Sequence, residues 1–176
     1  TPTTIPVGRI LLTRDLYDEL RKGTEFLLVD VLDVTHPQTI IKARYIPYAG
    51  RAGSFSDQIQ QQVATDLGGL TGKRPQYPIV FFCASAQCWE SYNAVLRANE
   101  AGYRNLYWYR GGLFAWQQAG LPMQPLRRCS VLTASIAGGR SAVGSSAMPA
   151  EYLPERASMS SMKKRPSGRR QGDQTC

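Results

Sequence analysis

Two uninterrupted apolar runs, at residues 26–31 and 78–82, are the clearest feature of the pattern of apolar and polar positions along the chain. Runs of this length are typical of strands that are covered on both faces, as in parallel sheets. An aromatic run predicts a further strand at 106–109, and the segment 40–49 predicts a short strand that ends in Pro47. The sequence therefore predicts a sheet with buried central strands.

Segments in which apolar residues recur at helical spacing lie between these strands. Thr13-Arg14-Asp15 can cap a helix that runs to Lys22 and stops at Gly23. Further helices are expected at 57–67, where Gly68-Gly69 would end the helix, at 89–101 and at 113–119. Because strands and helices alternate, we expect an α/β fold with a mainly parallel sheet. In such sheets the reactive site lies off the carboxyl ends of the strands.

Charge divides the chain into two parts. The formal net charge is +8, but residues 1–126 hold 12 lysines and arginines against 10 acidic residues, a net of +2. Residues 127–176 hold 9 against 3, a net of +6. We expect an extended leader at 1–8, one domain at 9–126, and a basic low-complexity tail at 127–176 that is disordered. The tail is either solvated without a specific role or binds acidic surfaces weakly, and the near-neutral domain predicts no specific nucleic-acid partner.

Cysteine and histidine usage excludes several kinds of site. Four cysteines without a CxxC pair do not make a disulfide framework; they are Cys83, Cys88, Cys129 and Cys176. We expect no functional role for Cys129 and Cys176. With His36 as the single histidine, we expect no metal site. No apolar stretch approaches the roughly 20 residues of a membrane helix, and no signal peptide remains, so we expect no membrane association.

Cys83 is the residue for which the sequence most clearly predicts chemical reactivity. It follows the apolar run 78–82, and small residues at 84–86 then lead into the predicted helix at 89–101. A thiol between a strand end and a helix start faces main-chain N–H groups and the positive end of the helix dipole. We therefore expect the loop amides to surround Cys83 and to favour its reactive thiolate. A buried structural cysteine is the alternative.

Three parts of the chain resemble the rhodanese-like (sulfurtransferase) domain over roughly residues 9–125. Leu28-Val29-Asp30-Val31 resembles the family's strand that ends in Asp. Residues 40–47 match the family's His-Ile-Pro-Gly-Ala-x-x-Ile-Pro stretch in register, with Thr39 in place of the His. Cys83 with its turn, and later Tyr109–Trp116, match the cysteine loop and the closing Gly-Gly-x-x-x-Trp. The resemblance implies a single domain with a mainly parallel five-stranded sheet flanked by helices.

A narrower resemblance concerns residues 88–94, Cys-Trp-Glu-Ser-Tyr-Asn-Ala. This stretch is similar to a bacterial subgroup named for its Cys-Trp motif and associated with PQQ-dependent catabolism. Many members of that subgroup are exported, which implies a periplasmic setting, with the cytoplasm as the alternative.

The family resemblance implies that Cys83 takes a sulfane sulfur from thiosulfate or a persulfide and passes it to a thiol or to cyanide. The partners are then a small sulfur donor and a thiol acceptor, and no cofactor is implied. The implied substrate-binding loop consists of Ala84, Ser85, Ala86, Gln87, Cys88 and Trp89. Asp30 would support the site or fix a turn, and Arg51 and Arg110 would attract an anionic donor or remain solvated surface charges.

Two residues of the loop, Trp89 and Cys88, decide which functions other than sulfur transfer remain as alternatives. A phosphatase of this kind requires Cys-x5-Arg, and Trp89 stands where that Arg would be, so we expect no phosphatase activity. Cys88 is either a small buried residue or a redox partner of Cys83 in a dithiol protein. A non-catalytic rhodanese-like binding or regulatory module is a further alternative.

The remaining candidates are predicted to be structural. We expect His36, next to Pro37, to be a surface residue. The three tryptophans, Trp89, Trp108 and Trp116, are expected in the core and not on a binding surface.

Overall fold

Five short parallel strands form the centre of the fold in the computed structural model, which describes residues 1–126. The predicted tail at 127–176, with Cys129 and Cys176, lies outside the described residues. The sheet has the strand order β1-β6-β5-β2-β4, and every neighbouring pair is parallel. Its strands are β1 (Arg9–Ile10), β2 (Leu27–Asp30), β4 (Arg44–Tyr45), β5 (Ile79–Phe82) and β6 (Leu106–Trp108). The predicted α/β fold with a mainly parallel five-stranded sheet is confirmed.

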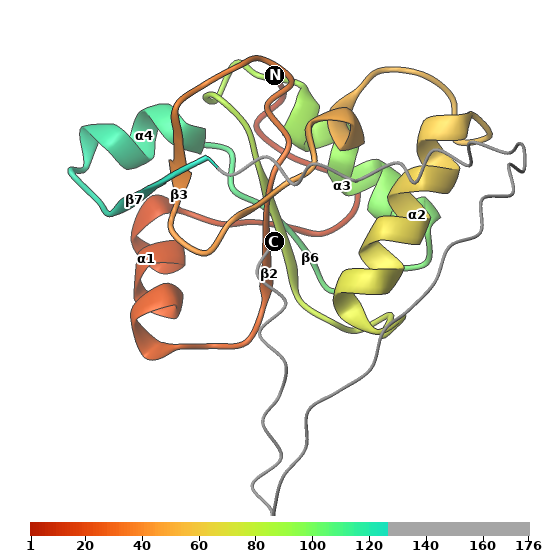
Figure 1. Cartoon of the computed structure of the whole chain (residues 1–176), viewed down its shortest axis with the longest axis horizontal. Coiled ribbons are helices and arrows are strands. Elements are labelled where there is room, and N and C mark those ends of the chain that lie inside the picture. Colours follow the sequence, from red (N-terminus) through yellow and green to blue (C-terminus); the bar gives the residue numbers. More distant parts are fainter. Residues whose placement is uncertain (127–176) are drawn as a thin grey trace, which may run out of the picture. The chain divides into compact units, whose positions relative to one another are not determined.

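Helices cover both faces of this sheet (Figure 1). On one side lie α1 (Thr13–Lys22) and α4 (Gly112–Gln118), and on the other lie α2 (Gln58–Thr71) and α3 (Glu90–Glu100). Because both faces are covered, every residue of the central strands β2 and β5 is buried. Removing each large apolar side chain of these strands from water contributes about 1.5–3 kcal/mol to folding. No helix of residues 1–126 is long and apolar enough to cross a bilayer.

The segment 40–49, predicted as one strand, is divided between two sheets, so that prediction is wrong. β3 (Gln38–Ile40) pairs antiparallel with β7 (Met123–Pro125), whereas β4 pairs with β2. The chain changes direction at Lys42, whose φ is +64°. After β4, a short 3-10 helix, η1 (Pro47–Gly50), leads away from the sheet.

Two predicted helix ends differ from the observed ones. Leu12, not Thr13, is the N-cap of α1, because the Thr13 hydroxyl instead bonds with the Tyr109 hydroxyl at 3.0 Å. α2 continues through Gly68-Gly69 to Thr71, which donates to the Leu67 carbonyl and bonds the buried Tyr103 hydroxyl at 2.8 Å. These tertiary contacts outweigh the low helix propensity of glycine. The predicted stop of α1 at Gly23, with φ +72°, is confirmed.

Candidate active site

Cys83 directly follows β5 and therefore lies at the carboxyl end of the sheet, as predicted. The loop from Cys83 to Trp89 then enters α3. The start of α4 holds this loop from the other side, because Leu113 N–H donates to the Cys83 carbonyl at 2.9 Å and Phe114 N–H to the Ala84 carbonyl at 2.8 Å. Gly112 permits this approach, since a Cβ on it would lie 2.4 Å from the Cys83 carbonyl oxygen.

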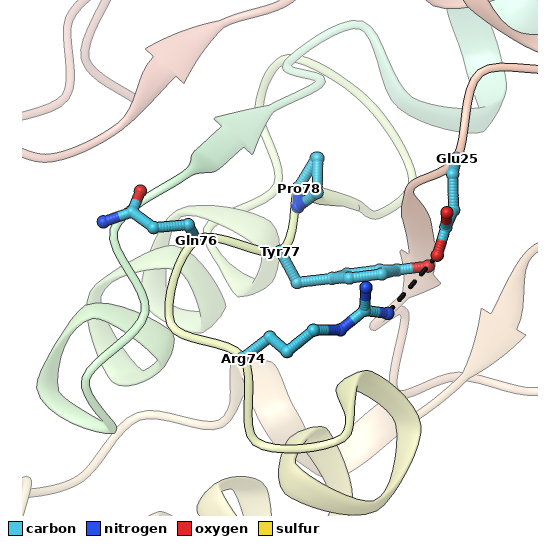
Figure 2. A pocket seen from close by; sticks show the side chains of 5 residues that line it. All are labelled: Glu25, Arg74, Gln76, Tyr77 and Pro78. Carbon is cyan, nitrogen blue, oxygen red and sulfur yellow. Dashed lines mark hydrogen bonds and ion pairs between the residues drawn. The ribbon is translucent and has the colours of Figure 1, made fainter.

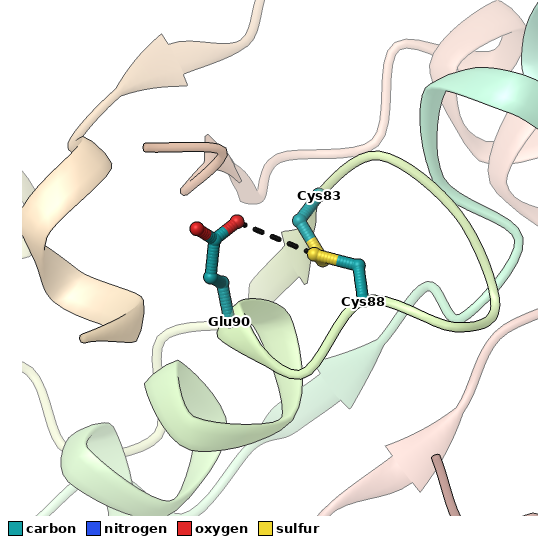
Figure 3. Close-up of side chains that lie close together, drawn as sticks. All are labelled: Cys83, Cys88 and Glu90. Atoms are coloured by element: carbon teal, nitrogen blue, oxygen red, sulfur yellow. Dashed lines mark hydrogen bonds between the residues drawn. A yellow bond between two sulfur atoms is a disulfide. The ribbon is translucent and has the colours of Figure 1, made fainter. Parts of the chain in front are cut away.

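The sulfur of Cys83 forms a disulfide with Cys88 (Figure 3). The two Cα atoms are 6.3 Å apart, within the range that a disulfide spans without backbone movement. Cys83 is only 1% exposed, whereas Cys88 is half-buried. A small reductant therefore reaches the sulfur of Cys88 more easily than that of Cys83.

The expected ring of loop amides around Cys83 is not present in this state. Gln87 N–H donates to the Ser85 hydroxyl at 3.3 Å, and Cys88 N–H donates to the Ser85 carbonyl at 3.0 Å. The main-chain N–H that reaches the Cys83 sulfur is that of Ser91, at 3.4 Å in the first turn of α3. The prediction from small residues is wrong for the amides of Gln87 and Cys88, because both donate to Ser85 within the turn.

Ser91 is a site residue that the sequence analysis missed. Its buried hydroxyl oxygen lies 3.0 Å from the Cys83 sulfur and accepts a hydrogen bond from the Trp108 indole N–H at 2.9 Å. A disulfide sulfur carries no hydrogen, so the Ser91 hydroxyl is the group that donates in this contact. A serine in the first turn of the helix after a candidate cysteine loop is the signal that could have found it.

Glu90 is the second residue that the sequence analysis missed. Its Oε2 lies 3.3 Å from the Cys88 sulfur, and its Oε1 accepts from Asp33 N–H at 3.3 Å. Burial raises the pKa of Glu90, the Asp33 amide lowers it, and the carboxylates of Asp33 and Asp30 raise it. Donor atoms of Cys83, Cys88 and Glu90 lie within 4.8 Å of one another, but cysteine binds metal as a thiolate, which neither sulfur is while they share a bond.

Asp30 is completely buried beside the loop and fixes the chain that follows β2. Its carboxylate accepts from Leu32 N–H at 3.1 Å and from the Thr39 hydroxyl at 2.5 Å, and it contacts the His36 Nε2 at 2.9 Å. The His36 side chain is 11% exposed, so its prediction as a surface residue is wrong. The partly buried contact with the Asp30 carboxylate explains the position of His36.

The two candidate anion-attracting arginines bind groups of the protein itself. Arg51 pairs with the Asp33 carboxylate at 2.5 Å. Arg110 donates from Nε to the Pro2 carbonyl at 3.0 Å and from its terminal nitrogen to the Thr1 carbonyl at 3.4 Å. The Thr1 hydroxyl in turn bonds the Ala86 carbonyl, so the leader contacts the cysteine loop.

Trp89, the last residue of the candidate substrate loop, is 54% exposed, so its prediction as a core residue is wrong. Its ring packs edge-on against Tyr92, which packs in the same way against Trp108. Trp108 and Trp116 are completely buried, as predicted. A row of aromatic rings thus leads from the surface beside the loop to the partner of Ser91.

Two pockets of the described residues lie at opposite ends of the strands. One lies beside the leader and the loop, where Leu12, Ala86 and Arg110 contribute to its wall. The other lies at the opposite, amino end of the strands, between Glu25 and Tyr77 (Figure 2). There Arg74 pairs with Glu25 at 3.3 Å and stacks on the Tyr77 ring, so its charge is satisfied internally. Of the two, only the first includes a residue of the cysteine loop, Ala86, in its wall.

The sequence model of the Rhodanese-like domain matches residues 13–119. The chain belongs to the rhodanese-like domain family. The matched segment contains Cys83, Cys88, Glu90 and Ser91, so the whole disulfide site lies within the family's domain. No curated protein matches the chain.

Solved structures share the rhodanese-like fold with this domain. A full-length protein from Lactobacillus plantarum is 19% identical, with a TM-score of 0.52 over 66% of this chain and 88% of that one. A protein from Bacillus halodurans is 20% identical, with a TM-score of 0.52 over 66% and 77%. A yeast protein tyrosine phosphatase of the rhodanese family is 19% identical, with a TM-score of 0.50 over 65% and 88%. At these identities the likeness concerns the fold alone.

Proposed function

We propose that this rhodanese-like domain is a sulfurtransferase in which Cys83 carries the transferred sulfane sulfur as a persulfide. The observation that carries the proposal is the position of Cys83 at the carboxyl end of β5, with its sulfur against the first turn of α3. Family membership supports a role of the sulfurtransferase type. The donor is thiosulfate or a persulfide, and the acceptor is a thiol or cyanide.

The surroundings of the Cys83 sulfur support an ionised thiol once the disulfide is open. The Ser91 N–H and the Ser91 hydroxyl both direct hydrogen toward the sulfur. Ser91 belongs to the 11-residue helix α3, whose amino end carries partial positive charge. Hydrogen bonds from such groups stabilise a thiolate, and the same donors would stabilise the terminal charge of a persulfide.

The disulfide makes reduction the first step of this function. Sulfur transfer needs a free Cys83 thiolate, which attacks the outer sulfur of thiosulfate and releases sulfite. While Cys83 is bonded to Cys88, it has no thiolate to offer. The reduced protein is therefore the active form under this proposal.

Phosphatase activity is not proposed, although one structural relative is described as a tyrosine phosphatase. Such chemistry uses an arginine that binds phosphate in a bidentate manner. The position six residues after Cys83 is Trp89, and the two candidate anion-attracting arginines, Arg51 and Arg110, already bind Asp33 and the leader. The absence of an arginine in the loop favours sulfur over phosphate as the group transferred.

A dithiol oxidoreductase is the second candidate function, and the Cys83–Cys88 bond favours it. In that case the pair would exchange electrons with a thiol substrate and carry no sulfane sulfur. From the motif at 88–94 we also propose that the chain belongs to the bacterial Cys-Trp subgroup and functions in the periplasm.

Mass measurement separates these functions. The full chain with Cys88→Ser, which cannot close the disulfide, is reduced, incubated with thiosulfate and freed of excess donor, and its intact mass is compared with that of Cys83→Ser. The sulfurtransferase gains one sulfur atom and Cys83→Ser gains none at this position. If no donor adds sulfur to the reduced chain, but mild oxidation removes two hydrogens only when Cys83 and Cys88 are both present, the domain is a dithiol oxidoreductase.

A further inference from the structure

Glu90 is the one carboxyl group in contact with the disulfide among residues 1–126. Its Oε2 lies 3.3 Å from the sulfur of Cys88 and, like that sulfur, is half-buried at the start of α3 (Figure 3). A sulfur–oxygen pair at this distance forms a hydrogen bond when either partner carries a proton. Because the disulfide sulfur carries none, Cys88 can donate to Oε2 only in the reduced protein, as a thiol.

The backbone around Glu90 fixes the direction of its side chain. η1 lies so close to the start of α3 that a Cβ on Gly50 would be 2.5 Å from the Glu90 Cβ. Asn93 donates to the Gly50 carbonyl at 3.0 Å and holds the two elements together. From the other side, Asp33 N–H donates to the Glu90 Oε1 at 3.3 Å. The free oxygen, Oε2, is left to face Cys88.

The charges near Glu90 favour its neutral form. Of the two carboxylates that face it, Asp33 pairs with Arg51 and Asp30 contacts His36, whereas no cation of the described residues pairs with Glu90 itself. Burial raises the pKa of Glu90 most, and these carboxylates raise it further, against the lowering by the Asp33 amide. A carboxyl with a raised pKa exchanges protons near neutral pH more readily than an ordinary one.

We propose that Glu90 accepts the proton of Cys88 when the disulfide closes and returns a proton when it opens. The proposal rests on Cys83 as the reacting sulfur in the proposed function, and it adds the acceptor and the product. The acceptor of the Cys83 persulfide is Cys88 of the same chain, and the released product is hydrogen sulfide.

The disulfide closes when Cys88 attacks the Cys83 persulfide. Glu90 takes the proton of the Cys88 thiol, and the resulting thiolate attacks the Cys83 sulfur. The bond between Cys83 and its outer sulfur breaks, and that sulfur leaves with the electron pair. Glu90 returns the proton to it, which gives hydrosulfide. The two cysteines are oxidised to the disulfide, and the sulfane sulfur is reduced by the same two electrons to sulfide.

The experiment uses glutathione disulfide as the probe, so that the result does not depend on sulfane transfer. Full-length chains carrying Cys129→Ser and Cys176→Ser are reduced and mixed with glutathione disulfide. One cysteine thiolate attacks the probe and releases glutathione thiolate, and the other cysteine then displaces the second glutathione. Closure by Cys88 is followed in the chains whose mixed disulfide is on Cys83. Acid-quenched mass spectra follow the mixed disulfide and the closed Cys83–Cys88 bond over time and pH.

In Glu90→Gln we expect ring closure to slow by about 100-fold, so that the mixed disulfide accumulates. The pH profile of closure should lose the inflection that Glu90 gives the parent chain. Glu100→Gln, which removes an equal charge from the exposed end of α3, should close at the parent rate. Parent-like closure and an unchanged pH profile in Glu90→Gln, with parent-like circular dichroism, would overturn the proposal.

A second variant distinguishes failure of the sulfurtransferase proposal from failure of the proposed role of Glu90. Cys88→Ser removes the internal acceptor and should retain a Cys83 persulfide after treatment with thiosulfate. If it gains no sulfur while Glu90→Gln still slows ring closure, the sulfurtransferase proposal fails and the role of Glu90 stands. If it gains sulfur but the Cys88-containing chain releases no sulfide, the internal acceptor is wrong.

Discussion

The indole N–H of Trp108 donates to the Ser91 hydroxyl at 2.9 Å, and this fixes the direction of the hydroxyl hydrogen. With one lone pair of Ser91 occupied by Trp108, its own hydrogen is free to face the Cys83 sulfur 3.0 Å away. Strand β6 thus acts on the sulfur at the end of β5 through a residue of α3. This buried contact connects the packing of the core with the reactivity of the site.

Ser91→Ala should make Cys83 less reactive. The variant loses the hydroxyl donor to the thiolate, so the pKa of the Cys83 thiol should rise relative to the parent. In a reduced Cys88→Ser background, we expect alkylation of Cys83 at neutral pH to slow by about tenfold, because a hydrogen bond to a charged group contributes about 1.5 kcal/mol. Alkylation rates against pH give the test. Ser54→Ala, in an exposed loop, is the control, and equal profiles for both variants would contradict the role of Ser91.

Gly112→Ala should destabilise the domain and displace the cysteine loop. The added Cβ would lie 2.4 Å from the Cys83 carbonyl oxygen and 2.8 Å from the Ser85 nitrogen, at a φ of +62°. Overpacking and the left-handed backbone together cost about 2 kcal/mol or more. Gly120→Ala has the same backbone cost at φ +63° but has open space around the new Cβ. Urea unfolding of the two variants should therefore differ, and equal losses would show that contact with the loop is unimportant.

Asp57→Asn should alter the pH dependence of stability. Asp57 accepts from the buried Arg97 at 2.8 Å and 3.0 Å, and mainly for this reason its pKa is lowered. A carboxylate with a lowered folded-state pKa stabilises the protein above its unfolded pKa, near 4, and loses that contribution as the pH falls through the lower folded value. The variant should be less stable at neutral pH and lose less stability in acid. Thermal unfolding at several pH values checks this, with Asp15→Asn as an exposed control; parallel curves for parent and Asp57→Asn would contradict it.

The sequence was sufficient to predict the elements whose burial is complete. β5 is apolar throughout and β2 is apolar up to its last residue, Asp30, and a run of this kind has few alternatives to a central parallel strand. The segment around Lys42 was mispredicted because its reversal depends on β7, which is distant in the chain. Similarly, His36 lies inward because it contacts the Asp30 carboxylate, which neither residue type reveals by itself.

The candidate site was predicted only in part for the same reason. Cys83 lies where the strand–turn–helix pattern placed it. The groups that touch its disulfide, Ser91 and Glu90, belong to the first turn of α3, and their directions depend on Trp108 and η1. The small residues of the loop suggested amides facing the sulfur, but the amides of Gln87 and Cys88 instead donate to Ser85 within the turn. Side-chain contacts across elements are not visible in local spacing.

The most direct test of the account is to locate the transferred sulfur atom itself. The reduced Cys88→Ser chain is treated with thiosulfate that carries radioactive sulfur in its outer position, and its peptides are separated without reductant. We predict that the label lies on the peptide that contains Cys83 and moves to thiocyanate when cyanide is added. A protein without label, or with label only on peptides that contain Cys129 or Cys176, would contradict sulfur transfer by Cys83.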